Sequence, residues 1–200
     1  MLYLTINKAN FKIKRGKMNE GKKILEFITS RQSDRRYSDK PVEKAKLDRI
    51  TEAGRMAPSA CNAQPWKFVV VTDPALLKMI ADAASEKLTG MNTFVAQAPA
   101  IIAVVRERPN FSSRIGGTIK KKDYSYIDIG IATENICLQA RAEGIGSCII
   151  GWFDENLVRK ILSVPRGKRV LLLITLGYSL SEYRTKKRKS PGEVISYNKY

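Results

Sequence analysis

The sequence predicts a layered domain of the α/β type, in which helices alternate with short apolar strands. Two observations support this prediction. Runs of β-branched and apolar residues with the length of strands recur along the chain, and apolar residues at helical spacing separate them. No linker or internal repeat divides the 200 residues, which are enough for one large domain with a sizeable core.

Helices are predicted wherever apolar residues recur at helical spacing. The longest, Tyr124 to Glu143, is apolar on more than one side, so we expect it to be central, and Gly144 ends it. Asp73 and Pro74 suit the N-cap and the first position of another helix. The remaining helices are expected within residues 19–28, 41–57 and 156–162.

Strands are predicted where apolar and β-branched residues fill short runs between turn signals. These runs are Phe68–Thr72, Ala100–Val105, Ser147–Gly151 and Arg169–Tyr178. Residues 1–17 are basic and lack sustained periodicity, so we expect an N-terminal extension there and a single domain over residues 18–200.

The composition narrows the chemistry that this chain could perform. The chain contains no histidine, which excludes His-based triads, His general bases and zinc sites that contain histidine. The three cysteines, Cys61, Cys137 and Cys148, have no metal-ligand spacing and are odd in number, so neither a metal site nor a disulfide framework is expected. An enzyme with this sequence must use carboxylates, Tyr, Lys, Ser, Cys or a bound cofactor.

No apolar run approaches the roughly 20 residues of a membrane-spanning helix. The N-terminus lacks the pattern of a secretory signal peptide, so the expected location is the cytoplasm and no membrane partner is expected.

The formal net charge of +17 indicates an anionic partner. Lys and Arg crowd both ends of the chain, and Lys120–Lys122 form a further run. No zinc-finger, RNP or basic-zipper pattern accompanies this charge, so nucleic acid is not the favoured partner, although a basic nucleic-acid-binding protein stays an alternative.

The most informative segment is the turn Ala57–Trp66, which joins a predicted helix to a predicted strand. Its prolines fix the backbone and withhold N–H groups, so the remaining amides and polar side chains are offered to something else. A flat heteroaromatic ligand suits such a loop, and a plain connector is the alternative. We expect Trp66 to pack in the core and Cys61 to be a small buried residue.

Three other segments carry possible contacts with an anion or a cofactor. Ser30–Tyr37 presents arginines separated by Ser, a pattern that suits an anion, although a solvated basic connector is the alternative. Gly144–Asp154 is rich in glycine but runs from helix to strand, the reverse of a dinucleotide fingerprint. Lys186–Lys189 forms a basic run near the C-terminus, which could also be a disordered tail.

These four segments, in this order over about residues 20–200, resemble the motifs of the nitroreductase (flavin reductase) family. The resemblance implies FMN as the cofactor. The contacts that it implies are Arg31, Gln32, Ser33 and Arg35 with the phosphate, ribityl chain and pyrimidine edge, Pro58, Ser59, Ala60, Asn62 and Gln64 from the other subunit, Ile149, Ile150 and Gly151 beside the isoalloxazine, and Lys186 and Arg188 with the phosphate. Lys187 or Lys189 is the alternative phosphate contact if the register of this run differs.

The resemblance also implies an α+β fold with three α/β/α layers, a mixed and mainly antiparallel sheet, and a homodimer whose C-terminal arm, from about Pro191, reaches the partner subunit. It implies hydride transfer from NAD(P)H to a nitroaromatic, quinone or enone by a ping-pong mechanism, with no essential catalytic side chain. Trp152 stands where a common family form has a second glycine, so the resemblance does not predict the shape of the substrate pocket at this position. Reductive dehalogenation, and flavin binding without turnover, are alternatives.

Overall fold

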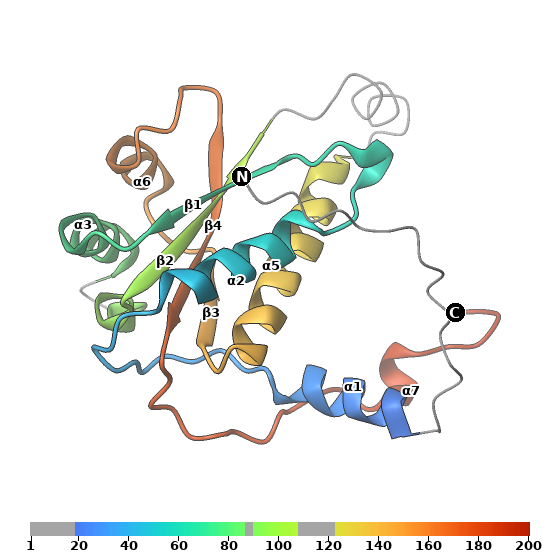
Figure 1. Cartoon of the computed structure of the whole chain (residues 1–200). Helices are drawn as coiled ribbons and strands as arrows, with labels where there is room; N and C mark the ends of the chain where they lie inside the picture. The colour runs from blue at the N-terminus through green and yellow to red at the C-terminus, as the bar shows by residue number, and fades with distance from the viewer. Residues whose placement is uncertain (1–18, 87–89, 108–122) are drawn as a thin grey trace, which may run out of the picture. The chain divides into compact units, whose positions relative to one another are not determined.

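A computed structural model of the chain describes residues 19–86, 90–107 and 123–200 (Figure 1). The chain forms two units, residues 1–31 and 32–200, and each is described by itself. In the first unit, helix α1 (Asn19–Ser30) has no buried residue. The predicted N-terminal extension lies outside the described residues, and its boundary with the domain stays a prediction.

A four-stranded sheet forms the centre of the second unit (Figure 1). Its strands β1 (Trp66–Val71), β2 (Ala100–Arg106), β3 (Gly146–Ile150) and β4 (Arg169–Gly177) lie in the order β1-β2-β4-β3. All neighbouring strands pair antiparallel. Within the described residues, the one parallel pairing is the bridge between Ser33 and Ser147. The predicted α+β class with a mainly antiparallel sheet is therefore confirmed.

Strand β2 is buried on both faces because a layer of helices covers each side of the sheet. Ile101, Ala103 and Val105 belong to the core beneath α3 (Pro74–Ala84) and α6 (Glu155–Ile161). The alternate residues Ala100, Ile102 and Val104 belong to the core beneath α2 (Lys44–Arg55) and α5 (Tyr124–Ala142). This alternation is the period-2 pattern of a strand, and it produces the three predicted layers.

The helix ends follow from local chemistry. Asp73 caps α3 by accepting a hydrogen bond from the Leu76 N–H at 2.9 Å, with Pro74 at the first position as predicted. Asp154 caps α6 by accepting a hydrogen bond from the Leu157 N–H at 2.9 Å. Helix α2 begins later than predicted, at Lys44, because Pro41 and Val42 belong to the connection before it.

Three short elements were not predicted from the sequence. They are the 3₁₀ turns η1 (Ala60–Asn62) and η2 (Thr93–Gln97), and helix α7 (Pro191–Val194) in the C-terminal segment. Among the residues that the structure describes, no helix is both long and apolar enough to cross a membrane. Over the same ranges, no cluster of His, Cys, Asp and Glu has the geometry of a metal site.

Candidate flavin site

The loop between α2 and β1 folds through an unusual backbone conformation. Cys61, Asn62 and Gln64 have φ angles of 53°, 50° and 46°, in the left-handed region that residues other than glycine rarely adopt. Ser59 closes this loop, since its Oγ accepts a hydrogen bond from the Gln64 N–H at 2.9 Å and its carbonyl accepts one from the Asn62 N–H at 3.0 Å. The result is a tight turn whose tip is exposed.

The two expectations for neighbouring side chains have different outcomes. Trp66 is buried and stacks on Phe68 with 6.3 Å between ring centroids, which confirms its predicted place in the core. The expectation that Cys61 is a buried filler is wrong, because this thiol is exposed. The left-handed backbone at Cys61 places it at the tip of the turn, which the composition of the loop does not indicate.

Residues 32–37, which we call the arginine strip, lie between β3 and the chain that follows β4. The Asp34 N–H donates to the carbonyl of Ser147, the second residue of β3, at 2.9 Å. On the other side, the Ser38 N–H donates to the Tyr178 carbonyl and the Leu180 N–H donates to the Arg36 carbonyl, each at 2.9 Å. The strip is thus fixed by backbone bonds on both sides.

A buried carboxylate organises the middle of the arginine strip. Asp34 is 5% exposed, and its Oδ1 accepts hydrogen bonds from Gln32 Nε2 at 2.9 Å and Ser179 Oγ at 2.8 Å. The hydroxyl of Tyr37 donates to the Asp34 carbonyl at 2.6 Å and lies 2.8 Å from Thr175 Oγ1. Burial raises the pKa of Tyr37, so this phenol stays protonated and able to donate.

Strand β3 lies at the end of the sheet, and within the described ranges no strand pairs with its outer edge beyond the bridge at Ser147. Successive residues of a strand direct their backbone groups to alternate edges, so Ile149 and Gly151 share the edge on which Ser147 bonds the strip. Ile150 faces the core and is 3% exposed, whereas Ile149 is 37% exposed. A Cβ placed on Gly151 would meet only Leu172 Cδ2, at 3.9 Å, so this backbone is open to a ligand.

Two of the predicted phosphate contacts, Lys186 and Arg188, lie in the C-terminal basic run and contact neighbouring residues. Lys186 lies over the Tyr183 ring at 5.3 Å, and Arg188 donates to the neighbouring Lys187 carbonyl at 2.8 Å. Arg184 was not among the predicted contacts, yet its guanidinium donates to the Ser33 carbonyl at 2.6 Å and its N–H donates to Gln32 Oε1 at 3.0 Å. The sequence signal that could have indicated Arg184 is a basic residue in the segment that follows β4.

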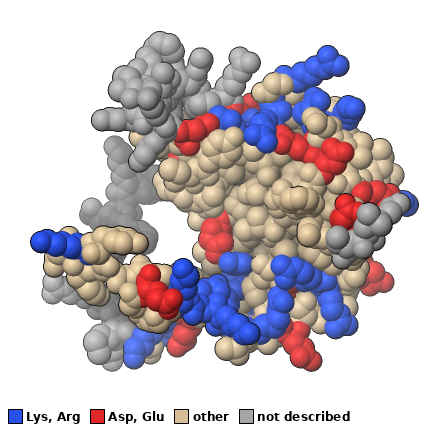
Figure 2. Space-filling model, turned by 180° about the vertical axis from the view of Figure 1, so that it is seen from behind, with Lys and Arg blue, Asp and Glu red and all other residues tan. Residues whose placement is uncertain are grey.

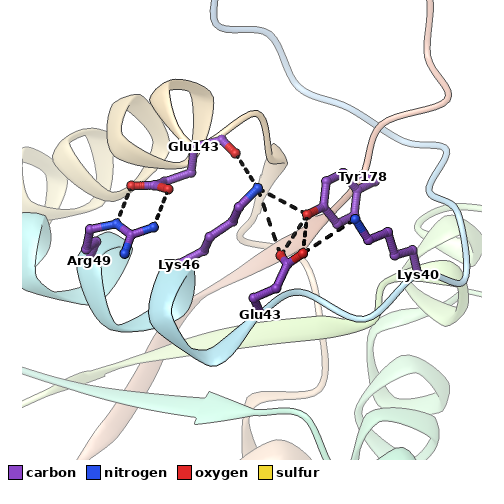
Figure 3. Close-up of polar contacts among 6 residues, drawn as sticks. All are labelled: Lys40, Glu43, Lys46, Arg49, Glu143 and Tyr178. Carbon is purple, nitrogen blue, oxygen red and sulfur yellow. Dashed lines mark hydrogen bonds and ion pairs between the residues drawn. The ribbon is translucent and has the colours of Figure 1, made fainter.

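A group of six charged and phenolic side chains, which we call the polar clamp, lies beside the end of the strip (Figure 3). The hydroxyl of Tyr178 donates to both carboxylate oxygens of Glu43, at 2.8 and 2.7 Å, and accepts from Lys46 Nζ at 3.1 Å. Lys46 also donates to the Glu143 carbonyl at 2.9 Å, which joins α2 to the end of α5. The other members are Lys40 and Arg49.

The polar clamp holds both of its carboxylates ionised. The hydrogen bond from Tyr178, assisted by Lys40, lowers the pKa of Glu43 to about 2. The bidentate hydrogen bonds from Arg49 lower the pKa of Glu143 to about 2. The hydrogen bonds of the clamp join α2, the end of α5 and Tyr178, so we assign it to stability rather than to the site.

Within one chain, the predicted cofactor contacts lie at opposite ends of α5 (Figure 1). Ala60 bonds to Asp128 near the start of the helix, whereas Ala140, near its end, accepts a hydrogen bond from the Ile145 N–H just before β3. At 1.5 Å per residue, Asp128 and Ala142 are separated by roughly 21 Å along the helix. The structure therefore brings Ser33 to β3, through its bridge with Ser147, whereas Gln32 bonds to the Arg184 N–H and Arg35 lies over the Phe94 ring at 5.8 Å. It does not bring the loop of Ser59, Asn62 and Gln64 to β3.

Arg31 ends the other unit and is described with that unit. Pro58 is exposed and Ala60 is half-buried at the start of the loop. Sequence reasoning missed Asp34, Ser179 and Asp128. For Asp128, the signal was a carboxylate among the apolar residues of the central helix.

Sequence comparisons find similar proteins over most of the chain. A family model described as the nitroreductase family matches residues 28–178. A protein of Archaeoglobus fulgidus, whose name proposes an NADH dehydrogenase or NAD(P)H nitroreductase, is 33% identical over 177 residues, covering 85% of this chain and 95% of its own. An oxygen-insensitive NADPH nitroreductase of Helicobacter pylori J99 is 27% identical, covering 90% of this chain and 99% of its own.

Solved structures show the same fold. An FMN-dependent nitroreductase from Clostridium difficile R20291 superposes with a TM-score of 0.71 at 27% identity, covering 88% of this chain and 99% of its own. The family and the enzyme class predicted from the motifs agree with these findings.

Proposed function

Because the chain belongs to the nitroreductase family, we propose that it is an FMN-dependent oxidoreductase that takes reducing equivalents from NAD(P)H. The observation that carries this proposal is the arginine strip fixed against the open edge of β3. The strip offers cationic and hydroxyl groups, and the β3 edge offers backbone donors. These are the groups that a phosphate and a flavin ring can use.

The residues present fit FMN. Ser33 and Gln32 are held in place by Arg184, so they would meet the ribityl chain and the phosphate with little loss of side-chain entropy. The open backbone at Gly151 leaves room for a flat ring beside Ile149. Lys186, Arg188 and the exposed Arg35 would supply positive charge to the phosphate.

We propose that each FMN site is completed by a second copy of the chain. The loop of Ser59–Gln64 lies at the other end of α5, too far from the strip of its own chain to share one flavin with it. Exposed apolar side chains near this loop favour an interface between two copies. They are Met56 at 63%, Tyr126 at 46% and Ile127 at 57% exposed.

The C-terminal segment is the proposed arm of this dimer. Val194, Ile195 and Tyr197 are 63%, 54% and 86% exposed, which is unfavourable for apolar side chains that stay in water. Packing on a partner subunit would bury them.

When bound, FMN supplies the hydride chemistry, and the protein's task is to bind and orient it. The arginines and lysines would neutralise the phosphate, and the backbone N–H groups at the edge of β3 would polarise the edge of the ring. We propose that NAD(P)H and an electron-poor acceptor, such as a nitroaromatic, quinone or enone, occupy the same open face in turn, which gives ping-pong kinetics. A cytoplasmic location stays a prediction.

The basic surface offers a second reading, binding to nucleic acid. Lys and Arg gather along the lower part of the face drawn in Figure 2, and Asp and Glu are scattered among them. Several cations of the domain are neutralised locally, since Arg49, Arg106 and Arg169 are paired with Glu143, Asp123 and Glu155. This local pairing favours the enzyme over a dedicated nucleic-acid-binding surface.

An absorbance spectrum of the purified protein after incubation with FMN, repeated anaerobically with NADPH, tests the proposal. We expect flavin bands that NADPH bleaches, and reoxidation by a quinone or a nitroaromatic. Bands that NADPH leaves unchanged would indicate flavin binding without turnover. Absence of flavin bands after incubation with FMN would contradict the proposal, and salt-dependent nucleic-acid binding would then be measured instead. Reoxidation by a halogenated aromatic with halide release, but not by quinones, would favour reductive dehalogenation.

A further inference from the structure

We infer that Asp128 is a positioning residue, whose buried carboxylate holds the loop of Ser59–Gln64 in the shape that the cofactor meets. The inference deepens the proposed function and rests on it for the loop's role. Asp128 lies in the second turn of α5, and its Oδ1 accepts the Ala60 N–H at 3.1 Å. This bond joins the loop to the central helix of the domain.

The environment of Asp128 is unusual for an acidic side chain. It is 4% exposed, and within the described residues its Oδ2 has no hydrogen-bond partner. No ion pair of Asp128 occurs among the described residues either. Burying a carboxylate with half of its bonding capacity unused destabilises the fold, so stability alone does not explain this residue.

The loop that Asp128 holds is itself strained. Three of its residues, Cys61, Asn62 and Gln64, have left-handed backbones, and none of them is glycine. Such conformations persist only where the surroundings determine them, and they concentrate at functional sites. The loop's internal bonds, between Ser59 and Gln64 and between Gln64 and Asn62, fix its shape but not its place on the domain.

A carboxylate suits this task better than a neutral acceptor. A hydrogen bond from a backbone N–H to a charged oxygen is shorter and about twice as strong as one to a neutral oxygen. Asp128 therefore fixes Ala60, which precedes the strained residues, and the loop's polar groups are presented in one arrangement. Asp128 does not touch the proposed cofactor contacts of the strip, so its effect passes through the loop.

The test compares three single variants of the full chain. Asp128→Ala removes the acceptor, and Asp128→Asn keeps an oxygen acceptor but removes the charge. Thr133→Val is the matched control, because Thr133 lies on the same helix, is 2% exposed and has an Oγ1 without a hydrogen-bond partner in the described residues. Each variant is measured for thermal midpoint, for amide hydrogen exchange over residues 57–65 without FMN, and for FMN affinity by fluorescence quenching.

In Asp128→Ala we expect exchange in the loop to accelerate at least tenfold and the Kd for FMN to rise about tenfold, a change equivalent to about 1.4 kcal/mol. Asp128→Asn should show a smaller change of the same kind, of about threefold. Thr133→Val should leave both quantities at the wild-type values, even if its thermal midpoint moves. A purely structural role would change the midpoint without a local effect on the loop.

Loop exchange and FMN affinity in Asp128→Ala that match those of Thr133→Val would overturn the inference. If Asp128→Ala does not fold, Asp128→Asn decides, and unchanged exchange in that variant overturns the inference. If the wild-type protein fails to bind FMN, the proposed function fails, while the exchange comparison still tests whether Asp128 holds the loop.

Discussion

The two ends of helix α5 hold their candidate contacts in different ways. At the end nearest β3, the arginine strip is fixed by backbone bonds to Ser147 and Tyr178, by the buried Asp34 and by Arg184. At the other end, the loop of Ser59–Gln64 is a strained turn joined to the helix through Asp128. Several separate hydrogen bonds thus hold the strip, whereas the hydrogen bond from Ala60 to Asp128 joins the loop to α5.

This difference indicates how the work is divided between the two ends. A phosphate and a ribityl chain need a fixed set of cations and donors, which the strip provides. We propose that the loop completes the site from a second copy, and the hydrogen bond from Ala60 to Asp128 holds its polar groups in the arrangement that the cofactor of that copy would meet. Substitutions at the two ends should therefore differ in their effects on stability and on FMN binding.

Gly146→Ala should have the largest effect, at the end nearest β3. A Cβ on Gly146 would lie 2.8 Å from Asp34 Oδ2 and 2.9 Å from Ser179 Cβ, so the strip would have to move away from β3. We expect a loss of about 1–3 kcal/mol in the free energy of unfolding, together with weak FMN binding. Urea denaturation measures the first quantity. Gly21→Ala is the control, because a Cβ there meets nothing within 4 Å, and an equal loss in that variant would contradict the account.

Arg184→Ala should weaken FMN binding with a smaller effect on stability. The variant loses the hydrogen bond to the Ser33 carbonyl and frees Gln32, at a cost of about 1 kcal/mol, which corresponds to roughly a fivefold rise in the Kd. Fluorescence titration with FMN measures this change. Lys189→Ala removes an exposed cation from the same C-terminal segment, and an equal effect there would mean that net charge, rather than position, decides affinity.

Glu43→Gln should reduce stability at neutral pH but not in strong acid. The folded pKa of Glu43 is about 2 and its ordinary value is 4.5, so the clamp's contribution is present above pH 4.5 and is lost as the pH falls toward 2. The difference in thermal midpoint between wild type and variant should therefore shrink across that range. Asp48→Asn, at an exposed pair with Lys44, should show a small difference throughout. A difference for Glu43→Gln that is constant with pH would contradict the assignment.

Trp152→Gly should have the smallest effect on the stability of the protein and should change the KM for the acceptor selectively. The indole is 69% exposed while its backbone carbonyl accepts a hydrogen bond from Asn92 Nδ2 at 2.8 Å, so the position is held without help from the side chain. We expect stability to change by less than about 0.5 kcal/mol. The KM for bulky acceptors should change by a few-fold, while the KM for NADPH stays constant. Equal changes in the KM for the acceptor and in the KM for NADPH would contradict a role of Trp152 in acceptor selection.

Local signals in the sequence predicted most of the fold. The continuous apolar run of β2, the helical spacing of apolar residues in α5 and the Asp73–Pro74 pair are each local signals in the sequence. The network around Asp34 could not be predicted in this way, because Ser179 lies 145 residues away and becomes its partner only through the sheet. The left-handed turn at Cys61 was missed for a similar reason, since contacts with Ser59 and α5 determine it rather than any glycine.

We propose that one FMN site needs the arginine strip of one copy and the loop of another. It is tested by co-expressing two differently tagged chains, one with Ser33→Ala and Arg35→Ala, the other with Asn62→Ala and Gln64→Ala. In a mixed pair, one site would then combine both intact parts and the other both altered parts. We predict one FMN per mixed pair by absorbance, and almost none in either variant alone. A mixed pair that binds no more FMN than its parent variants would contradict the account, because a site built within one chain carries one defect in every copy.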